Sequence, residues 1–171
     1  MIQNYIQLHN LDKIDPVMKD DVLNEIFELS VKRGNRNLVE LLIDKSRLNY
    51  LSLINGVKSR DLEIVNMILN IKNDPSFINT VIKEGTALNI AVRNNSIEIV
   101  KRLLSLPGIN TVLYDNKDNT PLMTAISNFN IEMIDLFVEY YGDQIGSQIW
   151  QMNKSIQNIF ASRKIPFCSY N

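Results

Sequence analysis

A repeat of 34 residues constrains the fold of this chain more than any other feature of its sequence. Residues 86–91 read TALNIA, and 34 residues later residues 120–125 read TPLMTA. A pair of large apolar residues follows each copy at the same offset, at 99–100 and again at 133–134. Self-similarity at this period indicates a solenoid built from one supersecondary unit. We expect each unit to be a short helix, a turn and a longer helix.

The two copies carry the residues of a known motif. The second copy keeps Thr120, Pro121, Leu122 and Ala125 of the pattern T-P-L-H-x-A and has Met123 in place of the His. The first copy keeps the Thr, the Leu and the final Ala of the pattern. An I-V-x-x-L-L-like stretch follows both. The chain therefore resembles the ankyrin repeat family, with two clear repeats at residues 86–142.

Two further stretches, within residues 22–72, resemble the template less closely, and we interpret them as degenerate repeats. Ser30 and Gly56 stand where the clear repeats have Ala91 and Ala125. We expect a small residue at these positions because neighbouring helix pairs stack closely there, and a larger side chain would force them apart.

The spacing of the four small residues predicts how the repeats are connected. They follow one another at 26, 35 and 34 residues, whereas an ankyrin repeat has about 33. The short first interval predicts a plain loop at residues 44–49. Residues 73–76 predict a turn before an irregular connection at 77–85. Residues 109–119 predict a hairpin, with Asp118 at positive φ where the family has Gly.

The resemblance implies an all-α fold, namely an ankyrin-type helical solenoid of about four helix-turn-helix repeats with at most one or two short β-hairpins and a C-terminal capping helix. Asp15 and Pro16 predict the start of a helix, as cap and first helical residue. We expect a single domain over residues 1–171, with these parts: an N-terminal cap (1–21), repeats at 22–46, 47–80, 81–113 and 114–143, and a cap helix with a tail (144–171).

Composition restricts the partners and the compartment. The formal net charge of −1 gives no general basic field, so neither a nucleic acid nor an anionic membrane is favoured as a partner. The chain has one Cys, Cys168, which indicates a reducing compartment. No signal peptide is recognisable, and no stretch approaches the roughly 18 apolar residues of a membrane span. We expect a soluble intracellular protein of the cytoplasm, with the nucleus left open.

The sequence offers little for catalysis. His9 is the only His and Cys168 the only Cys, so a four-ligand zinc site cannot be assembled from Cys and His. Neither of the Gly-rich phosphate-binding motifs is present. We expect no enzyme, no cofactor and no metal.

The resemblance also implies a concave binding surface lined by the hairpin tips and the C-terminal ends of the first helices. Three repeats place a base two residues after the small residue, and stacking would align these bases as a positive row for an acidic segment of another protein. The alternative is that each base stabilises the end of its own helix. The candidate protein-binding residues are Lys32, Arg33, Lys58, Lys83, Glu84, Arg93, Asn94, Tyr114, Asn116, Lys117, Asn119, Ser127 and Asn128.

Three functions of different classes follow from these observations. The leading one is a protein–protein interaction module that acts as an adaptor, scaffold or inhibitor. The second is a structural fragment of a longer ankyrin array without separate activity. The third is an effector enzyme, for which the sequence offers no site. The sequence determines neither the identity of the partner nor the oligomeric state.

Overall fold

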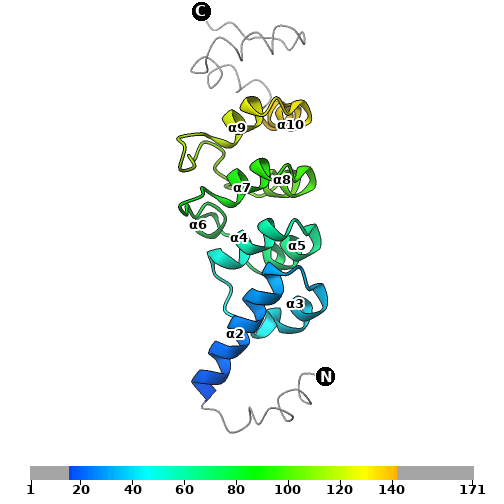
Figure 1. The fold of residues 1–171 in the computed structure, drawn as a ribbon, viewed down its shortest axis with the longest axis vertical. Coiled ribbons are helices and arrows are strands. Elements are labelled where there is room, and N and C mark those ends of the chain that lie inside the picture. The colour runs from blue at the N-terminus through cyan, green and yellow to red at the C-terminus, as the bar shows by residue number, and fades with distance from the viewer. Residues whose placement is uncertain (1–15, 142–171) are drawn as a thin grey trace, which may run out of the picture.

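The computed structural model describes residues 16–141, which form four helix pairs stacked along one axis (Figure 1). Each pair has a first helix, a turn and a second helix. The first helices are α2 (Pro16–Lys32), α4 (Tyr50–Ser59), α7 (Ala87–Arg93) and α9 (Pro121–Ser127). The second helices are α3 (Arg36–Leu42), α5 (Leu62–Ile71), α8 (Ile97–Leu104) and α10 (Ile131–Tyr141). The described residues contain no β-strand, so the predicted all-α solenoid is confirmed.

The helices begin where the sequence supplies a cap. Thr86 and Thr120 each accept a hydrogen bond from the third backbone N–H of the helix that follows, and Pro121 stands at the first turn of α9. Asp61 caps α5 by accepting from two backbone N–H groups. These side chains and Pro121 satisfy or remove donors that have no partner inside the helix. Residue 16 is the first described residue, so the predicted start of α2 at Asp15 and Pro16 stays a prediction.

Each turn between a first and a second helix has one residue in the left-handed region. The four residues are Gly34, Arg60, Asn95 and Phe129, with φ of 69°, 60°, 55° and 51°. Each lies four residues after the small residue of its repeat. Gly and Asn adopt this conformation readily, whereas a bulky side chain is strained there. Phe129 is also 74% exposed, so burial of its ring does not offset the strain.

A continuous apolar core runs through the stack. Its fully buried residues, all at 0% exposure, include Val31, Val39, Val57, Ile64, Val65, Ile68, Leu69, Leu88, Val100, Leu103, Met133 and Phe137. The small residues lie in this core. A Cβ at Gly56 would meet Ile68 Cδ1 at 3.2 Å and Ile64 and Val65 at 3.6 Å. Those atoms belong to α5, so at Gly56 the small residue brings together the two helices of one pair. We expected this closest contact between neighbouring pairs, whereas at Gly56 the nearest atoms belong to the same pair.

The connection before α7 differs from the prediction. Residues 73–76 do not form a simple turn, because Asp74 caps a one-turn helix, α6 (Pro75–Ile78), and accepts from Phe77 N at 3.0 Å. Phe77 and Ile78 are 5% and 1% exposed. An Asp-Pro pair suits a helix start as well as a turn, and burial of the next two apolar residues favours the helix.

Two loops project beside the first helices (Figure 1), and we call them finger 3 (residues 79–85) and finger 4 (residues 109–119). Finger 3 closes with an isolated bridge between Ile82 and Gly85. Finger 4 closes where Asp115 N donates to Asn119 O at 3.0 Å. Asp118 has φ of 57°, as predicted. Of the loop predicted at residues 44–49, residues 44 and 45 belong to a 3-10 helix, η2 (Ile43–Lys45). Residues 46–49 form a loop without a bridge.

Some predictions fall outside the described residues. They concern residues 1–15 of the N-terminal cap with His9, and the C-terminal cap helix and tail at 144–171 with Cys168. The predicted limit between residues 21 and 22 falls inside α2. The repeat limits remain predictions.

Replacing Phe129 by Gly should stabilise the protein. The substitution relieves a left-handed strain of about 1–2 kcal/mol, and the greater freedom of Gly in the unfolded chain offsets about 0.4–1 kcal/mol of that gain. We expect a net increase in the free energy of unfolding of roughly 0.5–1 kcal/mol, measured by urea denaturation. Phe129→Ala, which removes the ring but keeps the Cβ, should not give this gain. A less stable Phe129→Gly variant would contradict the strain.

Candidate partner-binding surface

The thirteen candidate residues occupy the two fingers and the ends of the first helices. Finger 3 carries Lys83 and Glu84, and finger 4 carries Tyr114, Asn116, Lys117 and Asn119. The helix ends carry Lys32 and Arg33 at α2, Lys58 at α4, Arg93 and Asn94 at α7, and Ser127 and Asn128 at α9. Four of the thirteen, Glu84, Arg93, Asn94 and Asn119, are half-buried, and the other nine are exposed.

Four charged side chains form a chain of contacts that we call the charge network, namely Lys58, Glu84, Arg93 and Asp115. Lys58 Nζ lies 2.7 Å from Glu84 Oε1. Arg93 Nη2 donates to the backbone oxygen of Glu84 at 3.0 Å, and Arg93 Nη1 lies 3.5 Å from Asp115 Oδ2. The network therefore joins α4, finger 3, α7 and finger 4.

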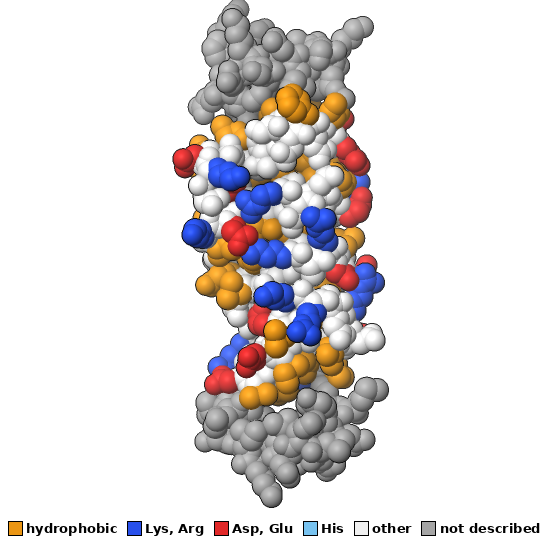
Figure 2. Space-filling view, in the orientation of Figure 1, with side chains coloured by type: hydrophobic (Ala, Val, Ile, Leu, Met, Phe, Trp, Pro, Cys, Tyr) orange, Lys and Arg blue, Asp and Glu red, His pale blue; other side chains and the backbone are white. Residues whose placement is uncertain are grey.

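The charge network places acidic side chains beside the predicted row of bases. Lys32, Lys58 and Arg93 each lie in the last turn of a first helix, where a positive charge is favourable. Two of them share Glu84, and Arg93 also contacts Asp115. In Figure 2, basic side chains follow the stack with acidic side chains between them. The row is therefore mixed in sign.

Asp115 holds the shape of finger 4. Its side chain is 5% exposed, and its Oδ1 accepts from the backbone N–H groups of Lys117 at 2.8 Å and Asn119 at 3.1 Å. Arg93 supplies the nearby positive charge on the other carboxylate oxygen. Asp115 lies within the hairpin predicted at residues 109–119, but nothing in the local sequence indicates its long-range contact with Arg93.

Asn89 links α7 to finger 4 and was not predicted to do so. Its side chain is buried, and its Oδ1 accepts from Thr86 N at 2.9 Å. Its Nδ2 donates to the backbone oxygens of Leu113 at 3.2 Å and Asn119 at 3.3 Å. Asn89 stands at the His position of the T-P-L-H-x-A pattern. A polar residue at this point in an otherwise apolar helix was the available signal.

Glu28 occupies the same repeat position in α2. It accepts hydrogen bonds from Ser52 Oγ and from Asn55 Nδ2, the latter at 3.0 Å, and both partners lie in α4. The position of the motif His therefore connects one pair to the next in the first repeat as well as in the third.

The sequence of residues 53–149 shows the family of this chain. A sequence model described as ankyrin repeats, with 3 copies, matches residues 53–149, more than half of the chain. The chain belongs to the ankyrin repeat family. The matched range begins in α4 and so includes the second of the two degenerate repeats. A search of curated proteins found no matching sequence.

Ankyrin repeats are generally protein–protein interaction modules, and the family is typically non-enzymatic. Among residues 16–141 of this ankyrin protein, no group of three or more His, Cys, Asp or Glu is placed to hold a metal ion. No helix in that range is long and apolar enough to span a membrane. The class of partner that the family favours is therefore a protein.

Replacing Asn89 by Ala should destabilise the ankyrin stack and loosen finger 4. The buried N–H of Thr86 would lose its acceptor, and the half-buried backbone oxygens of Leu113 and Asn119 would lose a donor, at a cost of about 1–3 kcal/mol. We expect a lower free energy of unfolding by urea denaturation and faster amide exchange in finger 4. Asn89→His, which restores the family residue and keeps a donor, is the matched variant and should retain more stability. An Ala variant as stable as the wild type would contradict this role.

The contribution of Glu84 to the free energy of unfolding should depend on pH. The hydrogen bond from Lys58 is the main cause that lowers the pKa of Glu84. A carboxylate whose folded-state pKa is depressed stabilises the fold above the unfolded pKa of about 4.3, and the stabilisation is lost as the pH falls through the lower folded-state pKa.

Glu84→Gln should therefore be less stable than the wild type at pH 7 and equally stable near pH 3. The Glu84 side chain is 47% exposed, so solvent screening keeps the difference below about 1 kcal/mol. Urea denaturation at both pH values measures it. Glu40→Gln, at an exposed carboxylate of α3 outside the charge network, is the control. A Glu84→Gln deficit that persists unchanged at low pH would contradict the assignment.

Proposed function

We propose that this chain is a protein–protein interaction module, an adaptor, scaffold or inhibitor, that binds an acidic segment of a partner protein on the finger side of the stack. The binding surface consists of fingers 3 and 4 and the ends of the first helices. The proposal places the chain in the cytoplasm, where its single Cys would stay reduced.

The observation that carries the proposal is a set of exposed cations on the fingers and helix ends. Lys32, Lys83 and Lys117 are exposed, and among the described residues none of the three takes part in an ion pair. An acidic segment would find complementary charge there. Lys58 can also contact an acidic segment if it gives up its contact with Glu84.

Aromatic side chains on the same elements support a protein partner. Tyr114 of finger 4 is 57% exposed. Phe129 is 74% exposed and follows directly after Ser127 and Asn128 at the end of α9. Aromatic residues are enriched among those that dominate interface energies. The retention of a strained Phe where Gly would fit is consistent with a role outside folding.

The rigidity of finger 4 supports the same proposal. Arg93 and Asn89 attach it to α7, and Asp115 closes its turn. A loop that is already ordered loses less entropy when it binds a partner.

Affinity capture with a matched charge variant tests this function. The test variant is Lys83→Glu with Lys117→Glu, and the control is Lys45→Glu with Lys72→Glu, which makes the same charge change at two exposed lysines outside the proposed surface. Neither test lysine takes part in an ion pair of the described residues, so the charge network stays intact. Circular dichroism should show all three proteins folded.

A partner retained by the wild type and the control should be lost by the test variant. With that partner purified, the test variant should bind at least about tenfold more weakly, equivalent to 1.4 kcal/mol. Phe129→Gly should also weaken binding while it stabilises the fold. Equal affinity of test and control variants would contradict the proposed surface.

A further inference from the structure

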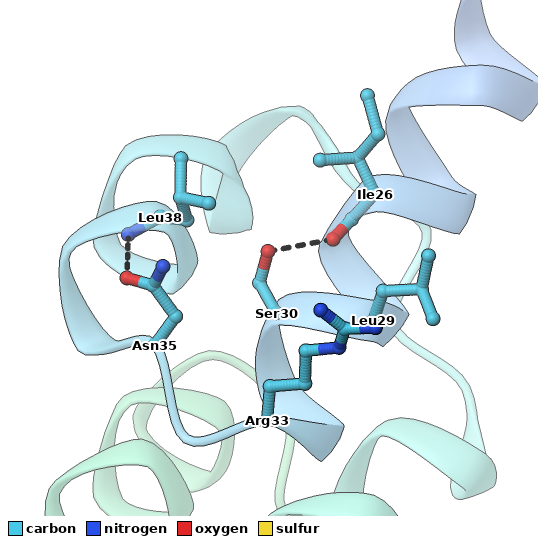
Figure 3. Close-up of a pocket in the computed structure, with 6 residues that line it drawn as sticks. All are labelled: Ile26, Leu29, Ser30, Arg33, Asn35 and Leu38. Carbon is cyan, nitrogen blue, oxygen red and sulfur yellow. Dashed lines mark hydrogen bonds between the residues drawn. The ribbon is translucent and has the colours of Figure 1, made fainter.

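An apolar groove at one end of the stack shows the effect of a pair that has a neighbour on one side only. It lies beside α2 and α3 (Figure 3), and Leu29 and Leu38 on its walls are 47% and 38% exposed. Among the described residues no helix pair precedes this one. The place of this groove in the stack therefore accounts for its exposed apolar side chains.

Another groove, of about 200 Å³, lies between α8 and α10, and we call it the α8–α10 groove. These helices belong to neighbouring pairs that contact each other, so a missing pair does not explain it. Leu104 is 7% exposed and Leu136 is half-buried. The lining residues are Lys101, Leu104 and Ser105 of α8 and its end, and Leu136, Glu139 and Tyr140 of α10.

The repeat register shows why this groove is open. At the equivalent place between α5 and α8, Arg102 Nε donates to Asn66 Oδ1 at 2.9 Å, and Arg102 Nη1 donates to Ser105 Oγ at 3.3 Å. One repeat later, Leu136 takes the position of Arg102 and Lys101 takes that of Asn66. Leucine is shorter than arginine and has no polar group to bond across the gap. The side chain that bridges α5 and α8 therefore has no counterpart between α8 and α10.

Tyr140 forms an aromatic wall of the α8–α10 groove. It is 42% exposed, whereas Leu106, its equivalent one repeat earlier, is 4% exposed. The Tyr140 ring packs edge-on against Tyr141, with the centroids 5.2 Å apart. The hydroxyl group of Tyr141 donates a hydrogen bond to the Thr111 hydroxyl oxygen. These contacts order the Tyr140 ring, so a partner that binds it loses less side-chain entropy.

The charge around the α8–α10 groove is negative. The two helices together carry four acidic and two basic residues, and both basic ones lie in α8. Lys101 Nζ lies 2.9 Å from Glu98 Oε1. This hydrogen bond is the main cause that raises the pKa of Lys101, and the charges of Glu132 and Glu139 add to the rise. In Figure 2, acidic side chains lie along the right-hand edge of the stack, on the side where Figure 1 shows α8 and α10.

We propose that the α8–α10 groove docks a basic segment of a partner protein. An apolar side chain of that segment lies against Leu136, and its Lys or Arg side chains lie beside Glu132 and Glu139. Opposite charges favour this pairing, and the face of the Tyr140 ring attracts a cation. A second copy that presented the same face would bring like charges together, which is unfavourable.

This surface is distinct from the one proposed for an acidic segment. The fingers project on one side of the stack, and α8 and α10 lie on the other (Figure 1). The chain would thus have two surfaces that select partners of opposite charge.

Selection from a random peptide library displayed on phage tests the inference. The library is first depleted on Lys101→Asn with Leu136→Arg, which copies the contact of Asn66 with Arg102 into the groove without a change in net charge. Circular dichroism should show this variant folded. Selection on the wild type should then enrich peptides that combine at least two Lys or Arg with an apolar residue. No enrichment, or enrichment of peptides without an excess of basic residues, would overturn the inference.

Charge variants keep the test decisive if the filled variant does not fold. A selected peptide should bind Glu132→Gln with Glu139→Gln at least about tenfold more weakly than the wild type. The control, Glu25→Gln with Glu40→Gln, makes the same charge change at exposed residues of α2 and α3 and should bind as the wild type does. The peptide should also shift the methyl resonances of Leu136. Equal affinity of both variants, or shifts confined to the fingers, would overturn the inference.

Other occupants of the groove would give different results. Self-association in sedimentation experiments that Glu132→Gln with Glu139→Gln abolishes would show that a second copy occupies the groove. Nuclear Overhauser effects between residues 142–171 and the methyl groups of Leu136 would show that the chain itself occupies it. Either result would overturn the inference and leave the proposed finger surface unaffected.

Discussion

The structure depends on one constraint, namely that a single helix pair cannot bury its own apolar residues. Ile64, Ile99 and Met133 are covered at one repeat position in three successive pairs, whereas Leu38 at the same position keeps 38% of its surface exposed. In a repeat stack, stability is the sum of weak individual units and the interfaces between neighbours. Order in each pair therefore depends on the pair beside it, and the ends are the places where this dependence is visible.

Polar contacts hold neighbouring pairs of this apolar stack in register. Glu28 reaches α4, Asn89 reaches finger 4, and the charge network runs from α4 to finger 4 through Glu84 and Arg93. The residues of the charge network lie on the fingers and helix ends where the proposed partner would bind. The same side chains thus hold neighbouring pairs in register and fix the fingers. A partner that takes Lys58 away from Glu84 would exchange one ion pair for another, so its binding should depend on salt concentration.

The sequence predicted the features that repeat and missed those that join distant parts of the chain. The 34-residue period predicted the helix pairs, and the family pattern predicted a positive φ at Asp118. The α6 helix was missed because Asp74-Pro75 suits both a turn and a helix start. Lys58 and Glu84 are 26 residues apart, and their contact depends on how one pair is stacked on the next. Local periodicity carries no information on contacts between residues so far apart in the sequence. The predicted bases therefore lie at the helix ends, but the acidic side chains beside them were not predicted.

The small residue of each repeat gives a second example. Its position followed from the sequence alignment of the four repeats, but the helix it faces did not. At Gly56 the nearest side chains belong to α5 of the same pair. Tight packing between two antiparallel helices and tight packing between two stacked pairs make the same demand on side-chain size. Only the arrangement in space distinguishes them.

Native-state hydrogen exchange, resolved by helix, tests the dependence of each pair on its neighbours most directly. Amides of α4, α5, α7 and α8, whose pairs have a neighbour on both sides, should exchange only through the opening of largest free energy. Amides of α3 and α10, in the first and last pairs of residues 16–141, should exchange through smaller openings. A single opening free energy shared by all four pairs would contradict the dependence of each pair on its neighbours.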